Sequence, residues 1–472
     1  MSRAKTARGL AQTAPRLRRQ VWLAPPRLRR QVWLALACLA SALAQPVGDR
    51  NRHVVVISLD GFPASVLRDP KLPFPVLRKL IREGAVAEGM KPVNPTVTWP
   101  NHTAMVTGVN TARHGVIYNG LPVRGGEGKP VRVEPWIDKT ELVQAPTVYD
   151  AAHAAGLTTA EVDWVAIYRP PTVTWPFPEL PKPDGAVERE MLAAGAITAE
   201  ELAMWGKTNN TLHDEIWTRA AVYIIEKHRP NLLLMHLLLT DSVQHQYGAG
   251  SLAAHTALIL ADRQVQRVLD AIDRAGIRDT TTVFVVSDHG FKAYQHIIRP
   301  NALLRAKGLL RGKDGAIDCD AWTIPEGGTA MVYVTREDRR EATLKTLSGT
   351  FQGVPGVGKV ILPAEYETYG YPAMKQGRMS DMVLVAEPGY GFDGNTNGET
   401  VVDVPSGAAG AHGYLNSDTD MNAILVAWGA GIQPGARLGL VPNVNIAPTI
   451  AHLLNLNLPG VEGVVMRELL RR

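Results

Sequence analysis

The chain has 472 residues, of which 45% are hydrophobic, a length and composition that suit one large globular domain and exclude a disordered protein. Its net charge of +5 suggests a nucleic-acid or membrane partner, but nine of the 50 Lys and Arg residues lie within residues 1–44, which contain no Asp or Glu. The rest of the chain therefore carries 41 basic and 45 acidic side chains. Its composition gives no sign of a nucleic-acid polymer as a partner.

Residues 1–44 have the pattern of a secretory signal peptide. The basic segment PRLRRQVWLA occurs twice, at 15–24 and 26–35, and is followed by the apolar run 32–40 and the small-residue site Ala42-Leu43-Ala44. The alternative is a one-pass anchor, but the apolar run is too short to span a hydrocarbon core of ~30 Å. We therefore expect export with cleavage, a periplasmic or secreted protein, and no stable membrane anchor. One cysteine, Cys319, remains beyond this leader, so the exported fold has no internal disulfide.

Residues 45–472 alternate between apolar strand patterns and amphipathic helix patterns. The predicted strands are 53–61, 231–241, 281–290 and 422–429, and the predicted helices are 74–84, 214–230, 251–276, 445–456 and 463–472. This alternation predicts an α/β catalytic domain with a mostly parallel central sheet and helices on both faces. Residues 300–410 are rich in Gly and Pro and have shorter apolar runs, such as 330–335 and 381–389. We interpret them as an inserted, smaller α+β cap region.

Carboxylates follow three of the apolar strands. Asp60, Asp241 and the pair Asp288-His289 each come directly after such a run. In open α/β sheets, ligands bind outside the carboxyl ends of the strands, so we expect these side chains to meet at one edge. Without a partner the carboxylates would repel one another, and a bound cation removes that repulsion.

Histidines complete a metal-ligand pattern. Asp241 and His245 are four residues apart, so they share one face if Asp241 opens a helix, and His412 lies in a Gly-flanked loop, GAHGYLN. Carboxylate and imidazole together suit Zn²⁺ or a similar divalent ion, although a solvated helix face and a turn residue are the alternative explanations. The sequence predicts two divalent ions, with Zn²⁺ expected, held by Asp60, Thr98, Asp241, His245, Asp288, His289 and His412.

Thr98 lies in the segment TVTWPNHTAMVTG at 96–108. It is expected at the start of a helix whose first turn contains Pro100, where free N–H groups and the helix dipole favour an anion. A threonine bound to a metal can lose its proton and attack phosphorus. The alternative is a plain N-cap role for Thr98. We interpret the neighbouring Thr96 as turn scaffolding.

Six motifs, in order, resemble the type I phosphodiesterase/nucleotide pyrophosphatase family of the alkaline phosphatase superfamily. They are VVVISLDGF, TVTWPNHTAMVTG, RHGVIYN, DSVQHQYG, SDHGF and AHGY, spread over residues 53 to 420. The resemblance implies an alkaline phosphatase-like fold, one zinc held by Asp241, His245 and His412, and a second held by Asp60, Thr98, Asp288 and His289. It also implies that Thr98 is the nucleophile and that the amide of Asn119 binds a non-bridging phosphate oxygen. His102 and His114 match no ligand of the family, and we interpret them as structural.

The activity that the resemblance implies is hydrolysis of phosphate diesters or nucleotide pyrophosphates through a covalent phospho-threonine intermediate. Monoesterase relatives grip the extra charge of their substrate with a Lys-x-Arg pair, whereas this chain has Val162 and Trp164 at the position that aligns with it. A diester with an aromatic or nucleotide group is therefore the expected substrate. Trp99, Trp164 and Tyr168 are expected to stack on that group, or else to belong to the core.

Other functions stay open at this point. A phosphomonoesterase or phosphonoacetate hydrolase of the same superfamily uses the same kind of site, and a non-catalytic metal- or nucleotide-binding protein could keep the ligands without turnover. A sulfatase is excluded, because the chain lacks a Cys or Ser nucleophile in a C/S-x-P-x-R context.

Overall fold

The computed structural model describes residues 48–313, 315–374, 377–404 and 409–472, so the predicted signal peptide lies outside the described residues. The described residues belong to one compact unit, Pro46–Arg472, and the fold described below is that of this unit. Among the described residues, none of the helices combines the length and the apolar composition needed to cross a membrane.

An eight-stranded sheet lies at the centre of this unit. Its strands in spatial order are β21 (Arg437–Pro442), β2 (Ala85–Lys91), β20 (Leu425–Gly429), β8 (Thr281–Val286), β1 (His53–Leu59), β7 (Leu232–Leu237), β5 (Thr159–Val162) and β6 (Trp175–Phe177). Strand β20 is antiparallel to both of its neighbours, and every other neighbouring pair is parallel. The predicted α/β fold with a mostly parallel sheet is confirmed.

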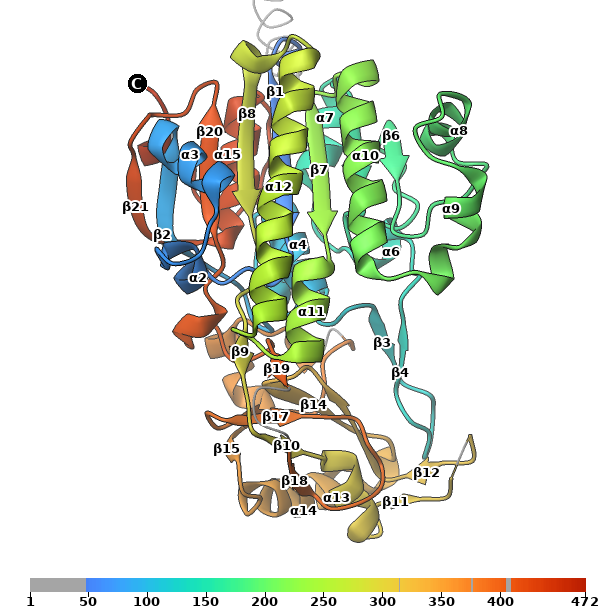
Figure 1. The fold of residues 1–472 in the computed structure, drawn as a ribbon. Coiled ribbons are helices and arrows are strands. Elements are labelled where there is room, and N and C mark those ends of the chain that lie inside the picture. Colours follow the sequence, from blue (N-terminus) through green and yellow to red (C-terminus); the bar gives the residue numbers. More distant parts are fainter. Residues whose placement is uncertain (1–47, 314, 375–376, 405–408) are drawn as a thin grey trace, which may run out of the picture. The chain divides into compact units, whose positions relative to one another are not determined.

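Helices cover both faces of the sheet (Figure 1). Along β1, Val55 and Ile57 pack into one core cluster, and Val54 and Val56 pack into the cluster on the opposite face. The first cluster includes residues of α3 (Pro75–Glu83), α10 (Asn210–His228) and α12 (Leu252–Arg274), and the second includes residues of α4 (Thr98–Thr107), α7 (Val148–Ala154) and α15 (Ile446–Leu453). Burial on both faces explains why the strand is continuously apolar in sequence.

Strands β7 and β8 are shorter than the strands predicted at 231–241 and 281–290. Strand β7 ends at Leu237 and helix α11 (Leu239–Tyr247) follows at once, so Asp241 lies in the first turn of α11. Strand β8 ends at Val286, and the pair Asp288-His289 lies in the loop beyond it. The carboxyl ends of the strands thus pass directly into the segments that carry the candidate ligands.

The helix predicted at 463–472 is wrong. The segment has one 3-10 turn, η8 (Arg467–Leu469), and is otherwise irregular. Its backbone bonds to other parts of the fold, since the N–H of Met466 donates to the Thr449 hydroxyl at 3.0 Å and the carbonyl of Leu469 accepts from the Gln433 N–H at 2.7 Å. Met466 and Leu469 are buried against the sheet, so tertiary contacts replace the helical ones.

The part of the chain interpreted as a cap contains a four-stranded antiparallel sheet. Its strands in spatial order are β13 (Ala321–Pro325), β14 (Thr329–Val334), β16 (Met382–Ala386) and β15 (Val357–Ile361). Helices α13 (Pro300–Ala306) and α14 (Arg340–Gln352) contribute to the hydrophobic cluster that it buries. Its interpretation as an inserted cap stays a prediction.

Short elements complete the fold. They are α2 (Ala64–Arg68), α5 (Thr111–His114), α6 (Lys139–Leu142), α8 (Ala186–Ala193), α9 (Ala199–Ala203), β3 (Leu121–Val123), β4 (Arg132–Glu134), β9 (Lys292–Ala293), β10 (His296–Ile298), β11 (Leu310–Arg311), β12 (Asp318–Cys319), β17 (Tyr390–Phe392), β18 (Val401–Asp403) and β19 (Gly410–Ala411).

Candidate active site

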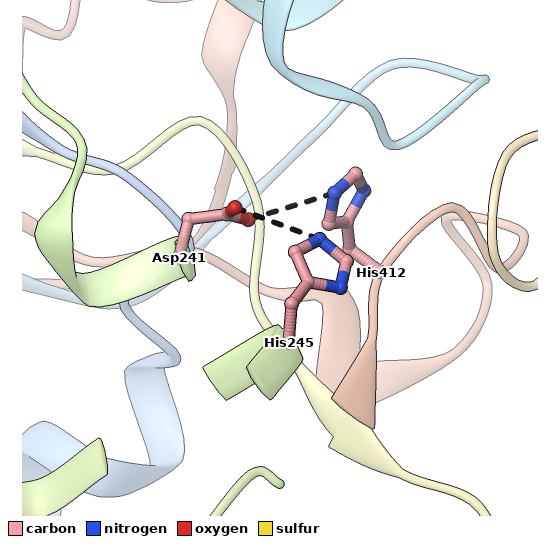
Figure 2. Close-up of side chains that lie close together, drawn as sticks. All are labelled: Asp241, His245 and His412. Carbon is pink, nitrogen blue, oxygen red and sulfur yellow. Dashed lines mark ion pairs between the residues drawn. The ribbon is translucent and has the colours of Figure 1, made fainter. Parts of the chain in front are cut away.

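The first ligand group joins helix α11 to the segment after β19. Asp241 and His245 lie one turn apart on α11, and His412 follows β19 directly (Figure 2). The Asp241 carboxylate lies 3.5 Å from Nε2 of His245 and 3.6 Å from Nε2 of His412. One ligand atom from each residue lies within 4.8 Å of the other two. The three residues that the sequence placed around one ion are therefore together.

The second ligand group lies at the ends of β1 and β8. Nε2 of His289 is 3.5 Å from Oδ1 of Asp60 and 3.2 Å from Oδ2 of Asp288. All three side chains are fully buried. The Thr98 hydroxyl is 3.5 Å from the same His289 nitrogen. This is the second set of residues that the sequence grouped around one ion.

The three candidate ligand histidines each bond to a backbone carbonyl through Nδ1. Nδ1 of His245 bonds to the carbonyl of Gly410, Nδ1 of His412 to that of Thr96, and Nδ1 of His289 to that of Gly290, each at 3.0 Å. A carbonyl is only an acceptor, so each Nδ1 carries the proton and each Nε2 keeps its lone pair free. Such outer contacts fix the tautomer of histidines that bind a metal.

Buried oxygens without partners mark the place where cations fit. Oδ1 of Asp60, Oδ1 of Asp241 and Oδ2 of Asp288 are buried and accept no hydrogen bond from the described residues. An unsatisfied buried polar group costs about 1–3 kcal/mol, and more when it is charged. Burial, followed by the charges of Asp288 and Asp241, raises the pKa of Asp60 well above its usual value. Two divalent cations would remove this cost and this repulsion, so the residues present fit a two-metal site.

The histidines of the site are also suited to bind metal. Burial, His289 and His245 lower the pKa of His412 well below its usual value, so this imidazole is neutral at physiological pH. Neutral imidazole is the form that coordinates a metal. The tight stacking of His289 on His412, with ring centroids 3.9 Å apart, brings the two ligand groups side by side.

Thr98 is the first residue of α4, and the N-cap position belongs to Val97. The alternative that Thr98 is a plain N-cap is therefore wrong, because its hydroxyl faces His289 instead of the helix N–H groups. Thr96 has the predicted scaffolding contacts. Its hydroxyl donates to the carbonyl of Tyr414 at 2.7 Å, and its own carbonyl accepts from His412.

Asn119 lies beside the start of α4. Its Oδ1 accepts the backbone N–H of Trp99 at 2.9 Å, so the carbonyl side of the amide is occupied and the NH₂ group remains as the donor. The side chain is half-buried. Asn119 thus sits next to Thr98 with a hydrogen-bond donor to offer.

A cavity of about 530 Å³ adjoins this region and is lined by Trp99, Trp164 and Tyr168, the three aromatic residues predicted for substrate binding. Trp164 is only 3% exposed and packs edge-on against His102, so it also belongs to the core, which was the alternative to stacking on the substrate. Sequence reasoning missed Trp136, which is 42% exposed, also lines the cavity and packs against Tyr168. It lies in a loop outside every motif, so no local signal pointed to it.

The remaining buried histidines lie outside the two ligand groups. His102 and His114 are fully buried, and burial is the main cause that lowers the pKa of each to about 3. Val162, one of the two residues at the position of the Lys-x-Arg pair of monoesterase relatives, is also fully buried, within β5. His236, by contrast, contacts Asp60 and was missed in the sequence, because it lies within the apolar strand β7 and belongs to no ligand spacing.

Comparison with known proteins identifies the family. The profile described as "Type I phosphodiesterase / nucleotide pyrophosphatase" matches residues 54–415. The chain belongs to this family. It is therefore a phosphodiesterase/nucleotide pyrophosphatase-family hydrolase of the alkaline phosphatase superfamily, with two candidate metal sites.

Similar members of the family come from animals. The human ectonucleotide pyrophosphatase/phosphodiesterase family member 5 is 21% identical over 89% of this chain and 78% of its own length. The human bis(5'-adenosyl)-triphosphatase ENPP4 is 23% identical over 85% of this chain and 78% of its own length. The structure of the murine family member 5 has a TM-score of 0.68 at 19% identity and covers 89% of this chain and 100% of that one. The same protein is also known as an inactive Thr→Ala form in complex with AMP.

Proposed function

We propose that this protein is a two-metal phosphodiesterase or nucleotide pyrophosphatase that uses Thr98 as its nucleophile and acts outside the cytoplasm. One observation carries the proposal. The Thr98 hydroxyl is not used for capping and lies 3.5 Å from His289, at the edge of two ligand groups whose carboxylate oxygens lack partners. That an inactive form of a similar enzyme is a Thr→Ala variant supports the role of a threonine.

The ligands favour zinc. Each group has at least one imidazole and one carboxylate, a donor set that suits Zn²⁺ better than Mg²⁺ or Ca²⁺, which prefer oxygen ligands. Two such ions supply charge neutralisation for the phosphoryl oxygens and a lowered pKa for a coordinated hydroxyl. Asp241, His245 and His412 would hold one ion, and Asp60, Asp288, His289 and Thr98 would hold the other.

The reaction follows from the position of Thr98. The Thr98 hydroxyl loses its proton and its oxygen forms a bond to phosphorus, while the bond from phosphorus to the departing alkoxide or phosphate breaks and the leaving group takes up a proton. Water then cleaves the phospho-threonine and restores the hydroxyl. The NH₂ group of Asn119 donates to a non-bridging oxygen, where charge increases in the transition state.

The cavity beside Thr98 supports a substrate with an aromatic or nucleotide group. Trp99 and Tyr168 are half-buried, and Trp136 is more exposed, so these three rings offer more free surface for stacking on a base than the buried Trp164 does. The complex of a similar protein with AMP supports a nucleotide. The leader pattern at 1–44 supports export, with the periplasm or the exterior as the place of action.

The experiment compares diester and monoester substrates. We expect Zn²⁺-dependent release of p-nitrophenol from p-nitrophenyl thymidine 5'-monophosphate, loss of activity with a chelator, and slower turnover of p-nitrophenyl phosphate. Thr98→Ala should lower kcat by more than about 10³-fold, because the covalent step is lost. Metal analysis of this variant should still find close to two ions per chain.

Thr98→Ser is the matched control, because it keeps a hydroxyl at the same position and should retain measurable turnover. Activity of Thr98→Ala within tenfold of the wild type would rule out Thr98 as the nucleophile. Faster turnover of the monoester than of the diester would favour a phosphomonoesterase instead. Export is tested separately, by N-terminal sequencing of the protein recovered from outside the cytoplasm.

A further inference from the structure

His236 connects a candidate metal ligand to a second buried carboxylate. It lies in β7 and is 1% exposed. Its Nε2 is 3.0 Å from Oδ2 of Asp60, and its Nδ1 is 3.0 Å from Oδ2 of Asp163 and 3.1 Å from the carbonyl of Asp163. The imidazole thus bridges the two carboxylates within the core.

This contact separates the two oxygens of Asp60. Oδ2 accepts the hydrogen bond from His236, while Oδ1 has no hydrogen-bond partner and lies 3.5 Å from Nε2 of His289. Rotation of the carboxylate would break the contact with His236. The imidazole therefore fixes the plane of the Asp60 carboxylate, with one oxygen bonded to His236 and the other directed toward the ligand group.

Asp163 is itself held firmly. It follows β5 with a φ of 55°, a left-handed conformation that non-glycine residues adopt only where the surrounding structure holds them. Its N–H donates to the carbonyl of Phe177 at 3.0 Å, which holds this turn against the end of β6. This turn places the carboxylate and the carbonyl of Asp163 beside the same nitrogen of His236.

The same array reaches the nucleophile and the cavity. The ring of His102 packs edge-on against His236, with centroids 4.6 Å apart, and against Trp164, with centroids 4.7 Å apart. Nδ1 of His102 bonds to the carbonyl of Thr98 at 2.9 Å. His236 therefore lies close to Asp60, the start of α4 and the cavity wall. Among the described residues, it makes no hydrogen bond or ion pair with the first ligand group.

We propose that His236 and Asp163 are positioning residues that orient Asp60 toward the metal ion held by Asp60, Asp288 and His289. His236 fixes the carboxylate of Asp60 through Nε2, and Asp163 holds the imidazole in place through Nδ1. This inference rests on the two-metal site of the proposed function. It assigns a role to two residues that no ligand motif includes.

Two amide variants of different length separate the two contacts of the imidazole. The side-chain amide of His236→Gln can place its nitrogen where Nε2 was, and so can still donate to Asp60. The shorter amide of His236→Asn reaches only the position of Nδ1, and so loses Asp60. Asp163→Asn keeps the shape of Asp163 but removes the charge that orients His236.

Metal affinity is the readout, measured by competition between a chromophoric chelator and the protein for Zn²⁺. In a His412→Ala background, which disables the first ligand group, His236→Asn should weaken the affinity for the remaining ion by about 10–100-fold. His236→Gln should recover most of that loss, and Asp163→Asn should fall between the two. In a His289→Ala background, which disables the second group, these variants should change the affinity clearly less than in the first background, because His236 interacts with Asp241 of the first group only at a distance.

His114→Gln is the matched control, because His114 is also a fully buried histidine but lies outside both ligand groups. Thermal unfolding of each metal-free variant shows whether it is folded. Equal losses at both ion sites, or the same loss in His114→Gln, would mean a purely structural role and overturn the inference. Wild-type affinity in His236→Asn would also overturn it while leaving the two-metal proposal intact, whereas a wild-type protein that binds no ion would overturn both.

Discussion

One hydrogen bond decides what Asn119 can do. Because its Oδ1 accepts the Trp99 N–H at 2.9 Å, the side chain cannot turn over without losing a backbone partner. The amide therefore presents its NH₂ group beside Thr98. In the proposed mechanism this donor would stabilise the charge that increases on a phosphorus-bound oxygen.

Replacement of Asn119 should affect turnover more than substrate binding. We expect Asn119→Ala to lower kcat by about 10²-fold or more, as the loss of one donor to a developing oxyanion does, with a smaller change in KM. Asn119→Asp keeps the acceptor for the Trp99 N–H but lacks the donor, so it should be at least as impaired. Steady-state kinetics with a p-nitrophenyl diester measure both, and an Asp variant with wild-type kcat would exclude a donor role.

At the scale of elements, the turn between β13 and β14 holds the loop that carries His412. The N–H of Gly328 donates to the carbonyl of His412 at 2.8 Å, and the Thr329 hydroxyl donates to the carbonyl of Gly413 at 2.8 Å. Gly327 has a φ of +83°, and a Cβ there would lie 2.3 Å from the carbonyl oxygen of His412. The four-stranded sheet thus supports a candidate metal ligand, His412, through this turn.

Loosening this turn should weaken the binding of one ion selectively. Thr329→Val has nearly the same shape but removes the hydroxyl that bonds to the Gly413 carbonyl and to the Glu326 carboxyl, and it should lower the affinity for the ion at Asp241, His245 and His412 by about tenfold. The ion at the other group should be unaffected. Competition with a chelator, again in a His289→Ala background, measures this affinity.

Thr323→Val is the matched control for the loss of a hydroxyl from the same small sheet. The Thr323 hydroxyl is buried and has no hydrogen-bond partner among the described residues, so its removal should leave metal affinity unchanged and stability unchanged or higher. If Thr323→Val and Thr329→Val weakened the ion equally, the effect would come from the sheet as a whole and not from the contact with Gly413.

At the scale of the whole molecule, buried acids make stability depend on pH. Burial raises the pKa of Glu161 and of Glu326 to about 8, from an ordinary value of 4.5. Between these values the folded protein keeps a proton that the unfolded chain has lost. The stability that each group contributes is therefore fully present below about pH 4.5 and is lost as the pH rises to about 8.

Glu326→Gln should reduce this pH dependence, because an amide does not titrate. A single group contributes a slope of up to about 1.4 kcal/mol per pH unit to the free energy of unfolding, so the variant should lose less stability than the wild type between pH 5 and about 8. Denaturant unfolding of the metal-free protein at several pH values measures the slope. Glu367→Gln, on the surface, controls for the loss of a carboxylate, and identical slopes for wild type and Glu326→Gln would contradict the prediction.

Local pattern was sufficient to predict much of the fold and the candidate ligands. Apolar runs that end in a carboxylate indicated where β1, β7 and β8 deliver Asp60, Asp241 and Asp288, because parallel strands bring their carboxyl ends to one edge. The four-residue spacing of Asp241 and His245 indicated one helix face. These features depend on neighbours in the chain, which the sequence contains.

Features that depend on distant contacts required the tertiary structure. The antiparallel direction of β20, the irregular C-terminal segment and the burial of Trp164 each follow from packing against residues far away in the chain. The contact of His236 with Asp60 and Asp163 joins the ends of three strands and has no spacing by which to recognise it. By itself, the sequence determined which chemical groups the protein has and on which local elements they lie, since these depend on residue type and on the regular periods of helix and strand. Only the tertiary structure decided which groups meet and which oxygen or nitrogen each one presents, because strand order, side-chain burial and long-range hydrogen bonds set those distances.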